Sequence, residues 1–122
     1  MAEYKTHLDE ESGITFIDVS GVLDTESVVP YMQSKPFIKR SSRVLCDLCN
    51  ASLENMTRGE LMKMLREVRQ LNKSGVRAAY VLNKGEDLGK AKAMVAQLET
   101  LGYDGTFKLF TDREKAVVWV KE

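Results

Sequence analysis

Apolar and polar positions follow two different periods along this chain, and segments of the two kinds alternate. Short apolar or every-second-residue patterns predict five strands, at 3–8, 14–20, 43–49, 76–83 and 106–110. The first two strands flank a charged turn at 9–13, so we expect them to form an antiparallel hairpin. The fourth is almost entirely apolar, which is typical of a central strand with parallel neighbours.

Apolar residues at helical spacing predict four helices between and after these strands. The helices are expected from near Thr25, over 58–74, over 86–101, and after Thr111. Asp24 is the expected N-cap of the first helix. Thr57 with Glu60 has the spacing of a capping box for the second helix, and Thr111 with Glu114 repeats it for the last.

The order of these elements predicts an α/β fold in one domain spanning 1–122. Two leading strands followed by strand–helix repeats favour a mixed, mainly parallel sheet of about five strands with about four helices. The chain has 122 residues, of which 43% are hydrophobic and 30% charged, and this composition suffices for one core.

Charge and hydropathy restrict the kinds of partner. The formal net charge is zero, so no general attraction to nucleic acid or to an anionic membrane is expected. No apolar run approaches the length of a membrane span. The segment 1–11 is polar and acidic, unlike a signal peptide, so we expect a cytoplasmic location.

The sequence contains no constellation that predicts catalysis, a metal site or a cofactor. Cys46 and Cys49 have C-x-x-C spacing, but residues three apart on a strand face opposite sides of a sheet. Two buried strand thiols are therefore favoured over a redox pair. Zinc would need two further ligands, and the only histidine, His7, is distant in sequence. Because no nucleophile–base pair is found either, we do not expect an enzyme.

The segment GEDLGK at 85–90 follows a strand and opens a helix, as phosphate-binding loops do. Its two glycines are one residue closer together than in the phosphate-binding motif G-x-x-x-x-G-K-[ST]. Ala91 is at the position where that motif has the hydroxyl residue that binds magnesium. Glu86 and Asp87 would repel phosphate, whereas they complement the positive end of a helix. Nucleotide hydrolysis is therefore not expected.

The segment 44–60 is the most informative, because a buried strand leads there through a polar loop into a capped helix. In an open α/β sheet, ligands and partners bind at the carboxyl ends of the strands. We therefore expect a partner-binding surface centred on Asp24, Asn50, Asn55, Met56, Thr57 and Arg58. The basic side chains of the following helix, Arg66, Arg69 and Lys73, are best interpreted as a solvated face, and alternatively as a surface for an acidic partner.

Three segments occur in an order and spacing found in a known family. They are FIDVSGVLD at 16–24, VLCDL at 44–48, and FTD at 110–112 with Ala116 and Trp119 after it. Together they resemble the STAS family, the anti-sigma-factor antagonist domains, and more closely its divergent SpoIIAA-like branch.

The resemblance implies a compact α/β domain that works by binding and has no catalytic residues. In the antagonists, a partner kinase phosphorylates a serine in the loop before the second helix. The corresponding position here is Met56, which cannot accept phosphate, and Thr57 beside it is expected to act as an N-cap. We therefore expect a non-enzymatic regulatory protein-interaction module without the phospho-serine switch and without a cofactor.

Two alternatives remain for what the domain binds. The SpoIIAA-like branch shares a fold type with lipid-carrying domains of the Sec14 kind, so a small-ligand or lipid-binding domain with an apolar pocket is the second hypothesis. It ranks second because a chain this short leaves little volume beyond its own close-packed core. A homodimer, formed through the first strand or the last helix, would cover an exposed sheet edge.

Overall fold

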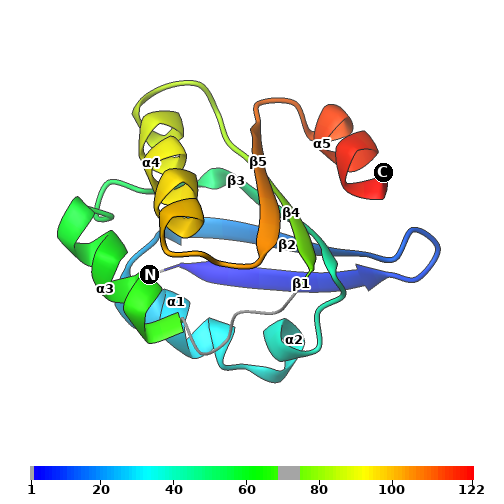
Figure 1. The fold of residues 1–122 in the computed structure, drawn as a ribbon, viewed down its shortest axis with the longest axis horizontal. Helices are drawn as coiled ribbons and strands as arrows, with labels where there is room; N and C mark the ends of the chain where they lie inside the picture. The colour runs from blue at the N-terminus through cyan, green and yellow to red at the C-terminus, as the bar shows by residue number, and fades with distance from the viewer. Residues whose placement is uncertain (1, 69–74) are drawn as a thin grey trace.

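The computed structural model describes residues 2–68 and 75–122 (Figure 1). These residues form one five-stranded sheet in which the strands stand in chain order, β1-β2-β3-β4-β5. The strands are β1 (Glu3–Asp9), β2 (Ile14–Val22), β3 (Arg43–Ser52), β4 (Val76–Val81) and β5 (Gly105–Phe110). Only β1 and β2 pair antiparallel, whereas the other pairs are parallel. The predicted α/β fold with a mixed, mainly parallel sheet is confirmed.

The helices cover the two faces of the sheet unequally (Figure 1). On one face lie α1 (Thr25–Met32), α2 (Lys35–Ile38), α3 (Arg58–Val68) and α4 (Glu86–Thr100). Within the described residues, α5 (Arg113–Lys121) alone packs on the other face. The short helix α2, which contains Pro36 in its first turn, is additional to the four helices expected. No helix in this described part of the chain is long and apolar enough to cross a membrane.

Adjacent residues of β3 and β4 point to opposite faces and so build two separate cores. Val44 and Ala78 lie in the core under α1 to α4, here named the four-helix core. Leu45 and Ala79 lie in the core under α5, here named the α5 core, and both are fully buried. The two cysteines follow the same alternation, as predicted: Cys46 packs against the four-helix core and Cys49 against the α5 core.

Two arginines of the sheet bind the C-terminal end of α5. Arg43 Nη1 donates a hydrogen bond to the Val120 carbonyl at 2.5 Å. Arg77 Nε donates to the Trp119 carbonyl at 2.9 Å, and its guanidinium lies 3.9 Å from the centre of the Trp119 ring. Positive charge at a helix C-terminus is stabilising, so these contacts fasten α5 to the sheet.

Strand β3 is longer than the apolar pattern at 43–49 predicts. It was predicted to end at Cys49, but it continues to Ser52 because its end pairs with the end of β2. The pairing resumes at Ser20 and Asn50 after a register shift that begins at Asp18, as in a β-bulge. The expectation that Asn50 lies in a loop is therefore wrong.

The helix ends also differ in part from expectation. The N-cap of α5 is Asp112 rather than Thr111, because its carboxylate accepts the backbone N–H groups of Glu114 at 2.9 Å and Lys115 at 3.4 Å. The predicted end of the second helix, at 69–74, lies outside the described residues.

The α5 core supplies a direct stability test. Val120 is fully buried beneath α5, so Val120→Ala should lower the free energy of unfolding by roughly 2 kcal/mol. Val118 on the same helix is 65% exposed, and Val118→Ala should change that free energy by less than about 0.5 kcal/mol. Urea denaturation measures both values. Equal losses in the two variants would contradict the inward orientation assigned to Val120.

Candidate functional site

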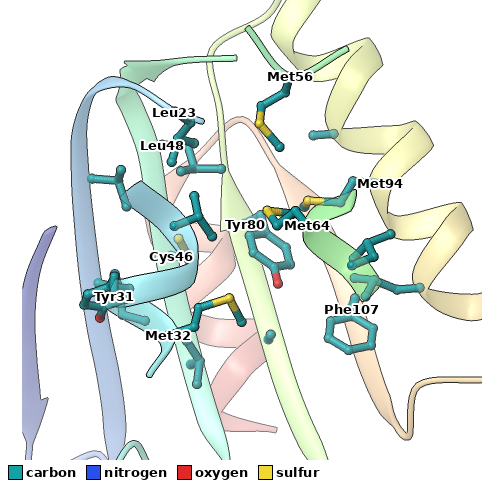
Figure 2. A pocket seen from close by; sticks show the side chains of 18 of the residues that line it. Leu23, Tyr31, Met32, Cys46, Leu48, Met56, Met64, Tyr80, Met94 and Phe107 are labelled. Atoms are coloured by element: carbon teal, nitrogen blue, oxygen red, sulfur yellow. The ribbon is translucent and has the colours of Figure 1, made fainter. Parts of the chain in front are cut away.

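An apolar cavity of about 200 Å³ lies between the sheet and the helices α1 to α4 (Figure 2). Its floor is formed by side chains of β2, β3 and β4 that belong to the four-helix core. Four of the six methionines of the chain line it: Met32, Met56, Met64 and Met94. Because methionine is unbranched and flexible, such walls adapt to the shape of an apolar ligand.

Most polar groups of the cavity wall are already bonded to the protein. The hydroxyls of Tyr31 and Thr6 share a hydrogen bond. The Tyr103 hydroxyl donates to the Leu65 carbonyl at 2.7 Å. Bonds of this kind leave an apolar interior with few groups to orient a ligand.

The Tyr80 hydroxyl is different. Tyr80 lies on β4 directly opposite Cys46 of β3, on the side of the four-helix core. Its hydroxyl makes no hydrogen bond within the described residues, although every fully enclosed side-chain oxygen and nitrogen there has a partner. The hydroxyl therefore borders open space, and in Figure 2 it points into the cavity. Burial raises the pKa of Tyr80 far above its usual value, so the hydroxyl keeps its proton and remains a donor.

Arg40 is a charged residue of the cavity wall. The residue is 9% exposed, its Nη1 donates to the Phe37 carbonyl at 2.9 Å, and its guanidinium carbon lies 3.9 Å from the centre of the Phe37 ring. Burial lowers the pKa of Arg40, but an arginine remains charged in a protein. That charge acts on the hydroxyls of both Tyr80 and Tyr31, where it lowers the pKa against the effect of burial.

The expected partner-binding residues lie mainly where α1 and α3 begin. Asp24 caps α1 by accepting the N–H of Ser27 at 2.8 Å. Thr57 Oγ1 accepts the N–H of Glu60 at 3.2 Å at the start of α3. The Glu60 carboxylate does not complete the capping box; it accepts a hydrogen bond from the Thr25 hydroxyl of α1 at 2.5 Å. The two helix starts are therefore joined by a side-chain contact.

Not all candidates lie on one surface. Asn55, Thr57 and Arg58 are exposed in the loop before α3 and at its first residue. Met56 is half-buried, packs against the four-helix core and lines the cavity. Asn50 is exposed but belongs to β3 itself. The structure thus links part of the candidate surface to the cavity through Met56, and no pattern in the sequence indicates this link.

The start of α4 holds this loop in place. The Asp87 carboxylate accepts the backbone N–H of Leu53 at 3.2 Å. The Lys90 ammonium donates to the carbonyls of Leu53 at 2.9 Å and Glu54 at 3.3 Å. The charged residues of the segment 85–90 therefore position the loop between β3 and α3.

A charged cluster on the other face of the sheet was not predicted. Arg113 Nη1 donates to Asp18 at 3.0 Å and to Asp47 at 2.6 Å, and its guanidinium lies 5.3 Å from the centre of the Phe16 ring. Burial would raise the pKa of Asp47, but the Cys49 N–H and Arg113 outweigh it and hold the pKa below its usual range. These residues come from distant segments, so no local pattern in the sequence pairs them.

Neither thiol is activated. Burial, with Asp47 and Asp18, raises the pKa of Cys46 to about 12. Burial, with a contact to Asp47, raises the pKa of Cys49 to about 11. Since the thiolate is the reactive form, both cysteines are poor nucleophiles at neutral pH.

Comparison with known proteins identifies the fold. No family model and no curated protein sequence matches the chain. A solved structure of a DUF3478 family protein with a SpoIIAA-like fold, from Shewanella loihica PV-4, matches with a TM-score of 0.59 and 21% identity, over 98% of this chain and 93% of that one. The chain has a SpoIIAA-like fold. An anti-sigma factor antagonist from Mycobacterium paratuberculosis matches at the same TM-score and 14% identity, over 100% of this chain and 96% of that one.

At these identities the likeness establishes the SpoIIAA-like fold alone. It confirms the resemblance in architecture that the segments at 16–24, 44–48 and 110–112 indicated. The cavity and the loop before α3 are formed by this chain's own side chains.

The Arg113 cluster predicts a pH-dependent contribution to stability. Because the pKa of Asp47 is lower in the folded than in the unfolded state, the ionised carboxylate stabilises the fold at any pH above the unfolded-state pKa of about 3.9. This stabilisation is lost as the pH falls through the folded-state pKa. Arg113→Met should therefore lower the free energy of unfolding at pH 7 by up to about 1 kcal/mol. The difference from wild type should shrink below about pH 4.

Urea denaturation at pH 7, 5 and 3 measures this difference. Lys92→Met, which removes an exposed charge from α4, is the control and should show no such trend. A difference between wild type and Arg113→Met that stays constant with pH would show that the ion pairs do not stabilise the fold.

Proposed function

We propose that this chain is a non-enzymatic binding domain whose cavity beneath α1 to α4 holds a small, mainly apolar ligand. The observation that carries the proposal is the cavity of about 200 Å³ in the four-helix core. The cavity is partly open to the outside, and because protein interiors are close-packed, an unfilled apolar hollow of this volume is a departure from close packing.

The size and chemistry of the cavity favour an apolar occupant over water. An apolar cavity of about 150 Å³ stays dry and takes up benzene. The cavity here is larger, and most of its polar groups are already bonded. Water inside it would find few partners, whereas an apolar ligand would restore the missing contacts.

Binding without chemistry is supported by the state of the candidate nucleophiles. The thiol of Cys46 lies beside the cavity, but burial raises its pKa to about 12. The Tyr80 hydroxyl is likewise held in its protonated form by burial. Groups in these states bind and orient a ligand rather than attack it.

The cavity can be tested with 1-hexanol as a neutral probe. We expect wild type to bind it with a Kd on the order of 1 mM, measured by nuclear magnetic resonance titration of backbone amides. Ala78 faces the cavity, so Ala78→Leu should abolish this binding and cost less than roughly 1 kcal/mol of stability.

The adjacent residue provides the matched control. Ala79 points into the α5 core, where it is fully buried, so Ala79→Leu should cost about 1–3 kcal/mol and leave 1-hexanol binding intact. Unchanged binding in Ala78→Leu, or amide shifts confined to the surface, would refute the cavity as the ligand site.

A protein partner is the second candidate, and we propose it for the surface before α3. Asn55, Thr57 and Arg58 are exposed there, beside the start of α1. One of the solved structures with the same fold is an anti-sigma factor antagonist, which supports a regulatory partner. The phospho-serine switch is not proposed, because Met56 is in the corresponding position. A cytoplasmic location and a homodimer stay predictions.

This surface is tested by Arg58→Glu, with Lys92→Glu on α4 as the control. Both side chains are exposed, so both variants should fold. Recovery of a specific partner from host cells, measured by quantitative mass spectrometry, should fall about tenfold for Arg58→Glu alone. Equal recovery with both variants would remove this surface. Met56→Glu is a poorer test, because it would change the cavity as well.

A further inference from the structure

The polar groups of the cavity indicate which ligand it takes, provided that the cavity is a ligand site as proposed above. An entirely apolar ligand would leave the Tyr80 hydroxyl, which points into the cavity, without a hydrogen-bond acceptor, and this arrangement is unfavourable. We propose that the occupant is a small anionic amphiphile, with its carboxylate at the Tyr80 hydroxyl and the Arg40 guanidinium and its hydrocarbon tail among the methionines.

The first support is the position of the Tyr80 hydroxyl. It projects from the floor of the cavity, next to Cys46 across the β3–β4 pair, and has no hydrogen-bond partner among the described residues. A protonated phenol in this position donates to an acceptor on the ligand. Binding sites in proteins commonly have this composition, with apolar walls and one or two polar groups that fix orientation.

The second support is the charge of Arg40. Arg40 is one of the residues that line the cavity, the residue is 9% exposed, and its positive charge lowers the pKa of the Tyr80 hydroxyl against the effect of burial. The guanidinium carbon lies over the Phe37 ring, 3.9 Å from its centre. A carboxylate placed between Tyr80 and Arg40 would receive charge-assisted hydrogen bonds, which are stronger than neutral ones.

The third support is the part of the cavity that would hold the hydrocarbon tail. The methionines Met56, Met64 and Met94 come from the loop before α3, from α3 and from α4, and together with Leu61 they give a flexible apolar wall. In Figure 2 these methionines lie on the side of the cavity where α3 and α4 approach the sheet. By proportion to a cavity of about 150 Å³ that takes benzene, about 200 Å³ has room for about eight non-hydrogen atoms. Hexanoate is of this size.

Hexanoate and its neutral isostere hexanamide test the assignment on the full chain at pH 7. Amide titrations should show that wild type binds hexanoate about tenfold more tightly than hexanamide. The ratio of the two affinities measures the effect of the Arg40 charge in the wild-type protein, so no substitution of this buried residue is needed. Tyr80→Phe, which removes only the hydroxyl, should weaken hexanoate binding about tenfold. Tyr31→Phe is the control, because the Tyr31 hydroxyl already bonds to Thr6, and it should change binding less than about twofold.

The outcomes separate this inference from the function on which it rests. Equal or tighter binding of hexanamide would overturn the anionic head group, and unchanged hexanoate binding in Tyr80→Phe would overturn the role of the hydroxyl. A loss in Tyr31→Phe equal to that in Tyr80→Phe would overturn the placement of the carboxylate. In each case binding of 1-hexanol would leave the cavity proposal standing. Failure of hexanoate, hexanamide and 1-hexanol alike would contradict the ligand-binding function itself.

Discussion

The arrangement of this molecule depends on the handedness of its strand–helix–strand connections. From β2 to β5 the sheet adds each new parallel strand on the same side of the last one. Since such connections are right-handed, every connecting helix must lie on the same face of the sheet. This constraint places α1, α2, α3 and α4 together and leaves the opposite face to α5, which follows the last strand.

The unequal covering accounts for where the protein is solid and where it is hollow. A single helix meets the sheet over a narrow strip, and small or β-branched residues such as Ala79, Val81 and Val120 are buried in that contact. On the other face several helices must meet both the sheet and one another. Their side chains do not fill the space between them, and the cavity with Tyr80 and Arg40 in its wall lies there.

Local patterns predicted much of the fold, because strand periodicity, helix caps and the hairpin turn depend on residues close in sequence. Asp24 and Thr57 act as the caps that their positions indicated. The extension of β3 through Asn50 was not predicted, because it depends on pairing with β2. Asn50 pairs there with Ser20, about thirty residues earlier in the chain.

The candidate site was less predictable. The exposed residues before α3 follow from the strand–loop–helix pattern, but the cavity depends on how side chains from nine helices and strands fail to fill a volume. Close packing is the general rule for a chain of this length, and it argued against a pocket. The contact of Arg113 with Asp18 and Asp47 was equally unpredictable, because it joins residues that are brought together only when the sheet has folded.

The agreement between strand order and chain order has a kinetic consequence. Every strand pairs with the strand that precedes or follows it in the sequence, so no pairing spans a distant part of the chain. Pairing each new strand therefore costs only the loop-closure entropy of the one segment that joins it to its neighbour. Most of these segments contain helices, which form from local contacts. The sheet can thus be assembled by successive addition to a growing edge, without waiting for a strand from the far end of the chain.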